Sequence, residues 1–192
     1  MIVFPHCKIN LGLHVTRKRD DGFHDIETIF YPVGWKDILE ITTGINEEFT
    51  LEISGLSVHG KLESNLIYKA WQLLKEDFSI PPLQVYLHKI LPMGAGLGGG
   101  SSDAAFMLKL LNNRFKLGLS NEKLREYAAK LGSDCPFFVE SKPCLAKGRG
   151  EILTPLNIDL SNYRIVVVMP KNISIGTAEA YSWIKQIGRA HV

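Results

Sequence analysis

The sequence predicts a fold that combines β-strands and α-helices, and three observations support this. Residues 2–54 consist of β-rich segments separated by turn residues. Residues 65–131 contain segments whose apolar residues recur at helical spacing. Within this second region, a glycine-rich loop joins a strand to a helix. With 192 residues, the chain can bury a real core in one domain, or in one domain and a fraction of another.

Four strands are expected in the first third of the chain, over residues 9–15, 26–33, 38–42 and 49–53. The sequence Asp20-Asp21-Gly22 is typical of a turn and separates the first two. Ser64 is the expected N-cap of a helix over residues 65–78. Two prolines then end this helix and lead into a strand over residues 83–90.

The segment from Leu91 to Ala105 is the most informative part of the chain. Its glycines lack a Cβ, so the backbone can adopt positive φ and approach a ligand closely. They are Gly94, Gly96, Gly98, Gly99 and Gly100. A helix over residues 101–113 is expected to follow, and its free N–H groups and positive dipole end favour an anion. The sequence therefore predicts a phosphate site at this loop.

Two well-known phosphate loops fit poorly here. A P-loop requires a lysine after the glycines, and none follows. Gly94, Gly96 and Gly99 satisfy the dinucleotide pattern G-x-G-x-x-G, but residues 120–131 are helical where that fold needs a second strand. A dinucleotide oxidoreductase is therefore a remote alternative. A flexible Gly/Ser linker is disfavoured, because an alternating strand and an apolar helix flank the loop.

The last third of the chain continues with helices and one strand. Ser120 is the expected N-cap of the helix that ends at Leu131, and Gly132 suits the position after it. A short helix is expected near Pro136. A turn is expected at residues 148–150, followed by a buried strand over residues 163–169.

Composition excludes several classes of function. The net charge is +2, from 22 basic and 20 acidic residues with no basic block, so a nucleic-acid interface is not expected. No apolar run approaches the roughly 20 residues of a membrane span. The three cysteines have no metal-binding spacing and fit packing roles in a reducing cytoplasm.

The glycine loop, from Pro92 to Ser102, closely resembles the phosphate loop of the GHMP kinases, which include galactokinase, homoserine kinase and mevalonate kinase. Three further segments resemble motifs of one branch of this family: residues 5–11 (PHCKINL), 19–24 (RDDGFH) and 131–138 (LGSDCPFF). That branch uses ATP to phosphorylate the 2-hydroxyl of a cytidine diphosphate sugar-alcohol, in the non-mevalonate route to isoprenoid precursors. The resemblance therefore implies a cytoplasmic ATP-dependent kinase.

The fold implied by the resemblance is α+β. Residues 1–155 are expected to form an N-terminal domain like domain 2 of ribosomal protein S5, and residues 156–192 the beginning of a truncated GHMP kinase C-terminal domain. The strand over residues 163–169 would then lack its sheet partners. We therefore expect self-association through this edge and little or no turnover.

The catalytic residues implied by the resemblance are Lys8 and Asp134. A carboxylate can accept the proton of the substrate alcohol, and a lysine can stabilise the charge that develops. On the residues alone, Asp134 could equally cap a short helix, and Lys8 could be an outward-facing residue of an edge strand.

The ligands implied by the resemblance are ATP, Mg²⁺ and the cytidine-containing substrate. For Mg²⁺, the candidate residues are Ser101 and Ser102, which could also simply cap the helix. The residues expected near ATP are Asn65, Leu66, Lys89, Pro92, Met93, Gly94, Ala95, Gly96, Leu97, Gly98, Gly99, Gly100, Ser101 and Ser102. The residues expected near the substrate are Asn10, Phe23, His24, Thr177 and Tyr181.

Three alternatives to this function stay open. The chain could be another GHMP small-molecule kinase, although the pair Phe23-His24 argues against it. It could be a nucleotide-binding fragment without turnover. A histidine such as His24 is also often just a solvated loop residue.

Overall fold

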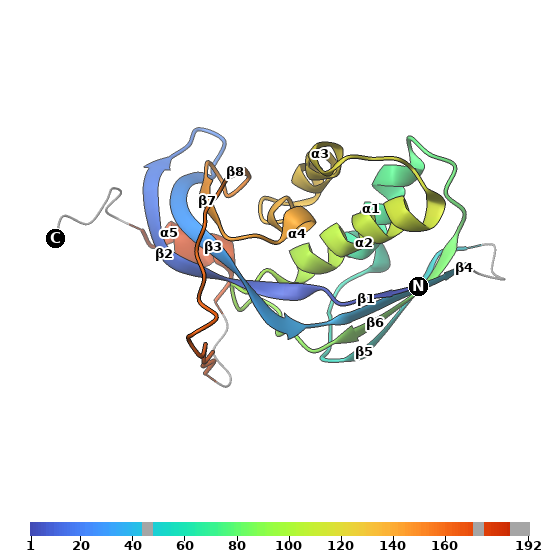
Figure 1. Cartoon of the computed structure of the whole chain (residues 1–192), viewed down its shortest axis with the longest axis horizontal. Coiled ribbons are helices and arrows are strands. Elements are labelled where there is room, and N and C mark those ends of the chain that lie inside the picture. Colours follow the sequence, from blue (N-terminus) through green and yellow to red (C-terminus); the bar gives the residue numbers. More distant parts are fainter. Residues whose placement is uncertain (44–47, 171–174, 185–192) are drawn as a thin grey trace.

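The computed structural model describes residues 1–43, 48–170 and 175–184 (Figure 1). They form two four-stranded sheets. In the first, the strand order is β1-β4-β6-β5; β5 pairs with β6 in parallel, and the other pairs are antiparallel. Its strands are β1 (Ile2–Val3), β4 (Ile38–Thr43), β6 (Leu83–Lys89) and β5 (Thr50–Gly55).

The second sheet is antiparallel throughout, with the order β2-β3-β7-β8. Its strands are β2 (His6–Lys18), β3 (His24–Lys36), β7 (Cys144–Lys147) and β8 (Ile152–Pro155). β2 and β3 form a long ribbon that is interrupted by three shifts in register. One shift falls at Gly12, whose φ of 68° lies in the left-handed region. This ribbon carries much of the candidate site.

The helices α1 (Leu66–Lys75) and α2 (Gly99–Phe115) lie along one face of the first sheet, and α3 (Asn121–Leu131) packs on these two helices (Figure 1). Trp71 and Leu74 of α1 and Met107 of α2 pack there against Leu39 and Val85 of the sheet. The apolar periodicity that predicts these helices is thus explained by burial on one face. The helices are η1 (Leu62–Ser64), α1 (Leu66–Lys75), α2 (Gly99–Phe115), α3 (Asn121–Leu131), α4 (Phe137–Glu140) and α5 (Thr177–Ser182).

Most elements expected from the sequence are present, with shifted ends. The four early strands and the strand before the glycine loop are confirmed, as are the helices after it. Ser120 caps α3 as expected, since its side chain accepts a hydrogen bond from the Lys123 amide. The expectation for Ser64 is wrong: Ser64 ends η1 and bonds to the Lys61 carbonyl, and Asn65 caps α1 instead.

Two differences concern strands in the last third of the chain. β7 and β8 were not expected, because each has only four residues. The expected strand over residues 163–169 is wrong within the described residues, because no neighbouring strand pairs with it. Its side chains alternate, with Val166 and Val168 81% and 84% exposed and Ile165 and Val167 39% and 40% exposed. Figure 1 shows this segment, in orange, running away from the two sheets.

Among the helices in the described ranges, none combines the length and apolar character that crossing a bilayer would require.

Candidate active site

A cavity of about 1020 Å³ brings together residues that are far apart in the sequence. The β2–β3 ribbon, the glycine loop and α5 contribute to its walls. From the residues expected at the site, the cavity is lined by Lys8, Asn10, Phe23, His24, Leu66, the whole run from Pro92 to Ser101, Asp134 and Tyr181.

The glycine loop leads directly into α2. Gly94, Gly96 and Gly98 have φ values of 69°, 70° and 70°, in the left-handed region that favours glycine. Gly98 is the N-cap residue of α2. The first amides of a helix lack partners within the helix, so this end of α2 presents hydrogen-bond donors to the cavity. The geometry fits an anion, as the sequence predicts.

Gly98 and Gly99 have little space for a side chain because other parts of the protein lie close to them. A Cβ on Gly98 would lie 2.9 Å from Cζ of Phe138 and 3.3 Å from Cε of Lys8. A Cβ on Gly99 would lie 3.1 Å from Nζ of Lys89. These neighbours are protein atoms beneath the loop. The glycines therefore let the loop pack closely onto α4 and the ends of β2 and β6.

Lys8 lies at the floor of the cavity, on β2. Its Nζ is 3.3 Å from Oδ2 of Asp134 and donates a 2.7 Å hydrogen bond to Oδ1 of Asn10. Only 6% of the Lys8 side chain is exposed, so its interpretation as an outward-facing edge residue is wrong. The Lys8 amide also donates to the Leu97 carbonyl at 2.9 Å, which ties β2 to the glycine loop.

Asp134 lies between α3 and α4, and its side chain is 31% exposed. The alternative that it caps the short helix is wrong, since the N-cap of α4 is Pro136 and no side chain caps it. The carboxylate is therefore free to face the cavity beside Lys8. Asn10 is itself fixed, because its Nδ2 donates to Oγ1 of Thr28 at 2.9 Å. A carboxylate, an ammonium group and an amide thus meet at one point.

Another part of the cavity wall is aromatic. The rings of His24 and Tyr181 are stacked, with centroids 5.2 Å apart and planes 30° apart. Burial raises the pKa of the Tyr181 hydroxyl, with a smaller contribution from the Asp134 charge. Phe23 is 51% exposed and presents its ring to the cavity. The side chain of Thr177, at the start of α5, lies outside the described residues.

A second cavity, of about 270 Å³, adjoins the glycine loop. Asn65, Leu66, Lys89, Met93 and Gly100 are among its lining residues. It therefore collects several of the residues that are expected near ATP. The side-chain oxygen of Asn65 is occupied by the cap of α1, where it accepts from the Ile67 amide at 2.9 Å.

The ammonium group of Lys89 is not available to a ligand. Its Nζ is 2.5 Å from Asp37 and 2.7 Å from Asp103, and the side chain has no exposed surface. Asp37 also accepts hydrogen bonds from the amides of Ile90 and Leu91, where the glycine loop begins. Lys89 therefore holds the base of the loop, and its side chain has no surface with which to make the expected contact with a nucleotide.

The two serines differ in their surroundings. Ser101 lines the large cavity, whereas Ser102 is fully buried and its Oγ has no hydrogen-bond partner. The carboxylate of Asp103 points to Lys89. The described residues contain no group of three or more His, Cys, Asp or Glu side chains that could hold a metal. A metal here would need most of its ligands from phosphate and water, which is the usual environment of Mg²⁺ in kinases. Ser101 fits such a site.

The sequence interpretation missed several residues of the cavity wall, and Arg149 is one of them. Arg149 lies in the β7–β8 turn, and its guanidinium group is 5.0 Å from the centroid of the Phe23 ring. The sequence Gly148-Arg149-Gly150 predicts a turn but gives no indication of what the turn faces. A Cβ on Gly150 would lie 3.4 Å from Oδ1 of Asp134, so the turn also touches the floor of the cavity.

Comparison with known proteins agrees with this geometry. Residues 65–142 match the family described as the GHMP kinases N terminal domain. A 4-diphosphocytidyl-2-C-methyl-D-erythritol kinase of Bacteroides fragilis is 52% identical over 187 residues, covering 96% of this chain and 68% of the relative. This chain belongs to the 4-diphosphocytidyl-2-C-methyl-D-erythritol kinase family. The Porphyromonas gingivalis member of the family is 47% identical and covers 98% of this chain, which covers 69% of that member.

A solved structure supports the same family. The crystal structure of a 4-(cytidine 5'-diphospho)-2C-methyl-D-erythritol kinase has a TM-score of 0.69 and 35% identity, over 83% of this chain and 56% of that one. A mevalonate kinase of Methanococcus jannaschii has a TM-score of 0.61 at 12% identity, over 82% and 56%, and shares the fold. The α+β fold of a GHMP kinase N-terminal domain is thus confirmed. The chain spans about two thirds of the length of its kinase relatives and little more than half of the solved one.

Proposed function

We propose that the chain carries the catalytic site of an ATP-dependent kinase that phosphorylates the 2-hydroxyl of 4-diphosphocytidyl-2-C-methyl-D-erythritol, a step of non-mevalonate isoprenoid precursor biosynthesis. One observation carries the proposal. The Lys8–Asp134 pair lies in a single cavity, whose walls also include the glycine loop at the start of α2 and an aromatic cluster. A phosphate donor and a nucleotide-bearing alcohol can therefore meet at the same point.

Transfer of a phosphoryl group depends on positioning and charge stabilisation more than on covalent chemistry. Asp134 would accept the proton of the attacking hydroxyl, since its carboxylate is partly exposed in the cavity. The Lys8 ammonium would stabilise the negative charge that develops on that oxygen. Asn10 holds Lys8 through its Oδ1 and would also position the hydroxyl.

The phosphates of ATP would lie on the glycine loop and the N-terminus of α2. Ser101 would hold Mg²⁺ together with the phosphates, and the bound metal would neutralise phosphate charge. The smaller cavity, beside Asn65 and Leu66, would receive the base and ribose.

The cytidine end of the substrate would lie at the aromatic part of the large cavity. Phe23 and Tyr181 offer ring faces for the base, and His24 offers a hydrogen-bonding edge. Thr177 stays a prediction for this part of the site.

The proposal also includes the compartment. The three cysteines are free and buried, which is typical of proteins that work in the reducing cytoplasm.

The test is an ADP-release assay on a preparation that turns over, with the cytidine substrate, homoserine and mevalonate as alternative acceptors. We expect turnover with the cytidine substrate, and we expect Asp134→Asn to lower kcat by roughly 10²–10⁴, the scale of general-base catalysis, with little change in ATP affinity. Lys123→Ala, an exposed lysine outside the cavity, is the control. Preference for homoserine or mevalonate would instead favour another GHMP kinase. ATP binding without turnover on any acceptor would favour a nucleotide-binding protein.

A further inference from the structure

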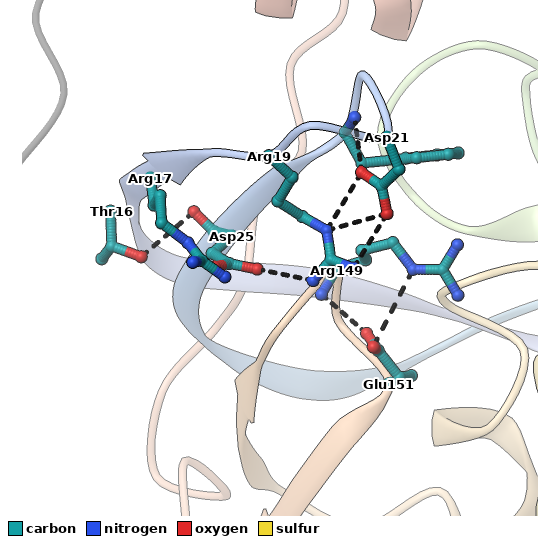
Figure 2. A network of polar contacts seen from close by, with 8 residues as sticks. Thr16, Arg17, Arg19, Asp21, Asp25, Arg149 and Glu151 are labelled. Carbon is teal, nitrogen blue, oxygen red and sulfur yellow. Dashed lines mark hydrogen bonds and ion pairs between the residues drawn. The ribbon is translucent and has the colours of Figure 1, made fainter.

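A network of ion pairs and hydrogen bonds surrounds the hairpin that carries Phe23 and His24 (Figure 2). Arg19 lies at its centre. Its Nη2 is 2.8 Å from Oδ2 of Asp21, and its Nη1 is 3.0 Å from Oδ1 of Asp25. Asp21 precedes the Phe23-His24 pair and Asp25 follows it. One guanidinium group therefore connects the two sides of the turn.

The same network fixes the backbone of Phe23. The Phe23 amide donates to Oδ1 of Asp21 at 3.1 Å, and the Phe23 carbonyl accepts from the Arg19 amide at 2.9 Å. The backbone N–H of Phe23 is thus held by Asp21, which binds the Arg19 guanidinium, and the backbone C=O of Phe23 is held by the amide of Arg19 itself. The ring of Phe23 is exposed, so nothing in the hydrophobic core determines its direction.

The β7–β8 turn supports the hairpin from the other side. The Arg149 guanidinium lies over the Phe23 ring, and Glu151 accepts a 2.6 Å hydrogen bond from the Arg149 amide. The Gly148 carbonyl accepts a 2.7 Å hydrogen bond from the Ile26 amide of β3. The ring of Phe23 thus has a cation on one face, which leaves its other face for a ligand.

The charges of this network persist across the neutral pH range. Hydrogen bonds from Arg19 hold the pKa of both the Asp21 and the Asp25 carboxyl below the usual value. These groups are nevertheless only partly buried, and ion pairs near the surface contribute little to global stability. A network of this size around one turn is better explained by the geometry that it imposes on the turn than by a contribution to the stability of the fold.

We propose that Arg19 is a positioning residue for the cytidine end of the substrate. By binding Asp21 and Asp25 together, it holds Phe23 and His24 in the direction that faces Tyr181 and the cavity. This inference rests on the proposed function, because it assumes that the aromatic part of the cavity receives a cytosine. Arg19 itself does not need to touch the ligand.

The test compares Arg19→Gln with Arg17→Gln in the 192-residue chain. Arg17 also binds Asp25, at 2.7 Å, but its side chain is 69% exposed and it does not contact Asp21 or the Phe23 backbone. The ligands are CDP for the substrate end and a non-hydrolysable ATP analogue for the phosphate loop, both titrated by calorimetry. A second readout is hydrogen exchange of the Phe23 amide, followed by NMR.

We expect Arg19→Gln to weaken CDP binding about tenfold, a part of what stacking on an aromatic ring provides, and to speed exchange of the Phe23 amide. The affinity for the ATP analogue should not change, and Arg17→Gln should alter neither ligand. Arg19→Lys should resemble Arg19→Gln, because an ammonium group cannot reproduce the planar fork that spans two carboxylates.

Four outcomes would overturn the inference. Arg19→Gln could bind CDP as tightly as the unaltered chain, or Arg17→Gln could weaken CDP equally. Arg19→Gln could also lose the ATP analogue, which would mean that Arg19 supports the whole fold and not the hairpin. If the unaltered chain binds the ATP analogue but not CDP, the proposed substrate itself is wrong, and the inference falls with it.

Discussion

Replacing Gly98 by alanine tests how the phosphate loop is held. Gly98 has a φ of 70°, and a Cβ there would lie 2.9 Å and 3.0 Å from two carbons of the Phe138 ring. Gly96 provides a matched control, because it has the same φ of 70° and a Cβ there would meet no atom within 4 Å. The two variants therefore share the backbone strain and differ in the steric contact.

The expected magnitudes follow from these two terms. The left-handed conformation costs an L-residue roughly 1–2 kcal/mol. Overpacking against a ring adds about 1–3 kcal/mol. Gly96→Ala should therefore lower the free energy of unfolding by roughly 1–2 kcal/mol, and Gly98→Ala by about 2–5 kcal/mol. The larger loss is a substantial part of the roughly 5–15 kcal/mol that stabilises a typical domain.

Urea unfolding followed by tryptophan fluorescence measures the difference, and Trp71 is a suitable probe because it is 5% exposed in the core. With a slope of about 1–3 kcal/mol per molar urea, the two midpoints should differ by roughly 1 M. Gly98→Ala should also weaken binding of the ATP analogue more than Gly96→Ala, because the methyl group displaces the loop. Equal midpoints for the two variants would show that the loop does not pack on Phe138 as described.

Three further predictions concern other parts of the chain. Lys89→Met leaves two carboxylates buried without their cation and should destabilise the fold by about 3–5 kcal/mol in urea unfolding, whereas Lys69→Met, on the exposed face of α1, should have no measurable effect. Burial raises the pKa of the Cys135 thiol from 9.0 to about 12, so this thiol favours the folded state below pH 9, and that contribution is lost as the pH rises through 12. Iodoacetamide at pH 8 should accordingly label the cysteines only after unfolding, and rapid labelling of the native chain, seen by mass spectrometry, would contradict this. The exposed apolar segment at residues 163–169 should cause self-association, which Val166→Lys with Val168→Lys should reduce in static light scattering; an unaltered chain that is monomeric at high concentration would refute it.

The sequence alone predicts the features of the fold that depend on neighbouring residues. The glycine loop between β6 and α2 is predictable because a strand, glycines and a helix start follow one another directly. The helix faces are predictable because burial on one face imposes the helical period. The failures are also local: Ser64 and Asn65 are both good caps, and the preceding 3-10 helix decides in favour of Asn65.

The candidate site required information that local patterns do not contain. Residues alone left the roles of Lys8 and Asp134 open, because their meeting depends on how β2 packs beside the α3–α4 corner. Family resemblance pointed to both. For Lys89, the resemblance suggested a nucleotide contact, whereas Asp37 and Asp103 bind its ammonium group from other elements. No spacing in the sequence indicates that Asp37, which lies 52 residues before Lys89, binds its ammonium group.

The position of Lys8 follows from contacts on both sides of one strand. Its amide donates a hydrogen bond to the Leu97 carbonyl, and its Cε would lie 3.3 Å from a Cβ on Gly98. The same side chain reaches Asn10 and Asp134 on the cavity floor. Because β2 contacts the glycine loop through its backbone and Asp134 through its lysine, one strand sets the distance between the proposed phosphate site and the proposed base. A displacement of the loop should therefore reduce turnover even where ATP still binds, since phosphoryl transfer is sensitive to misplacement of about 1 Å.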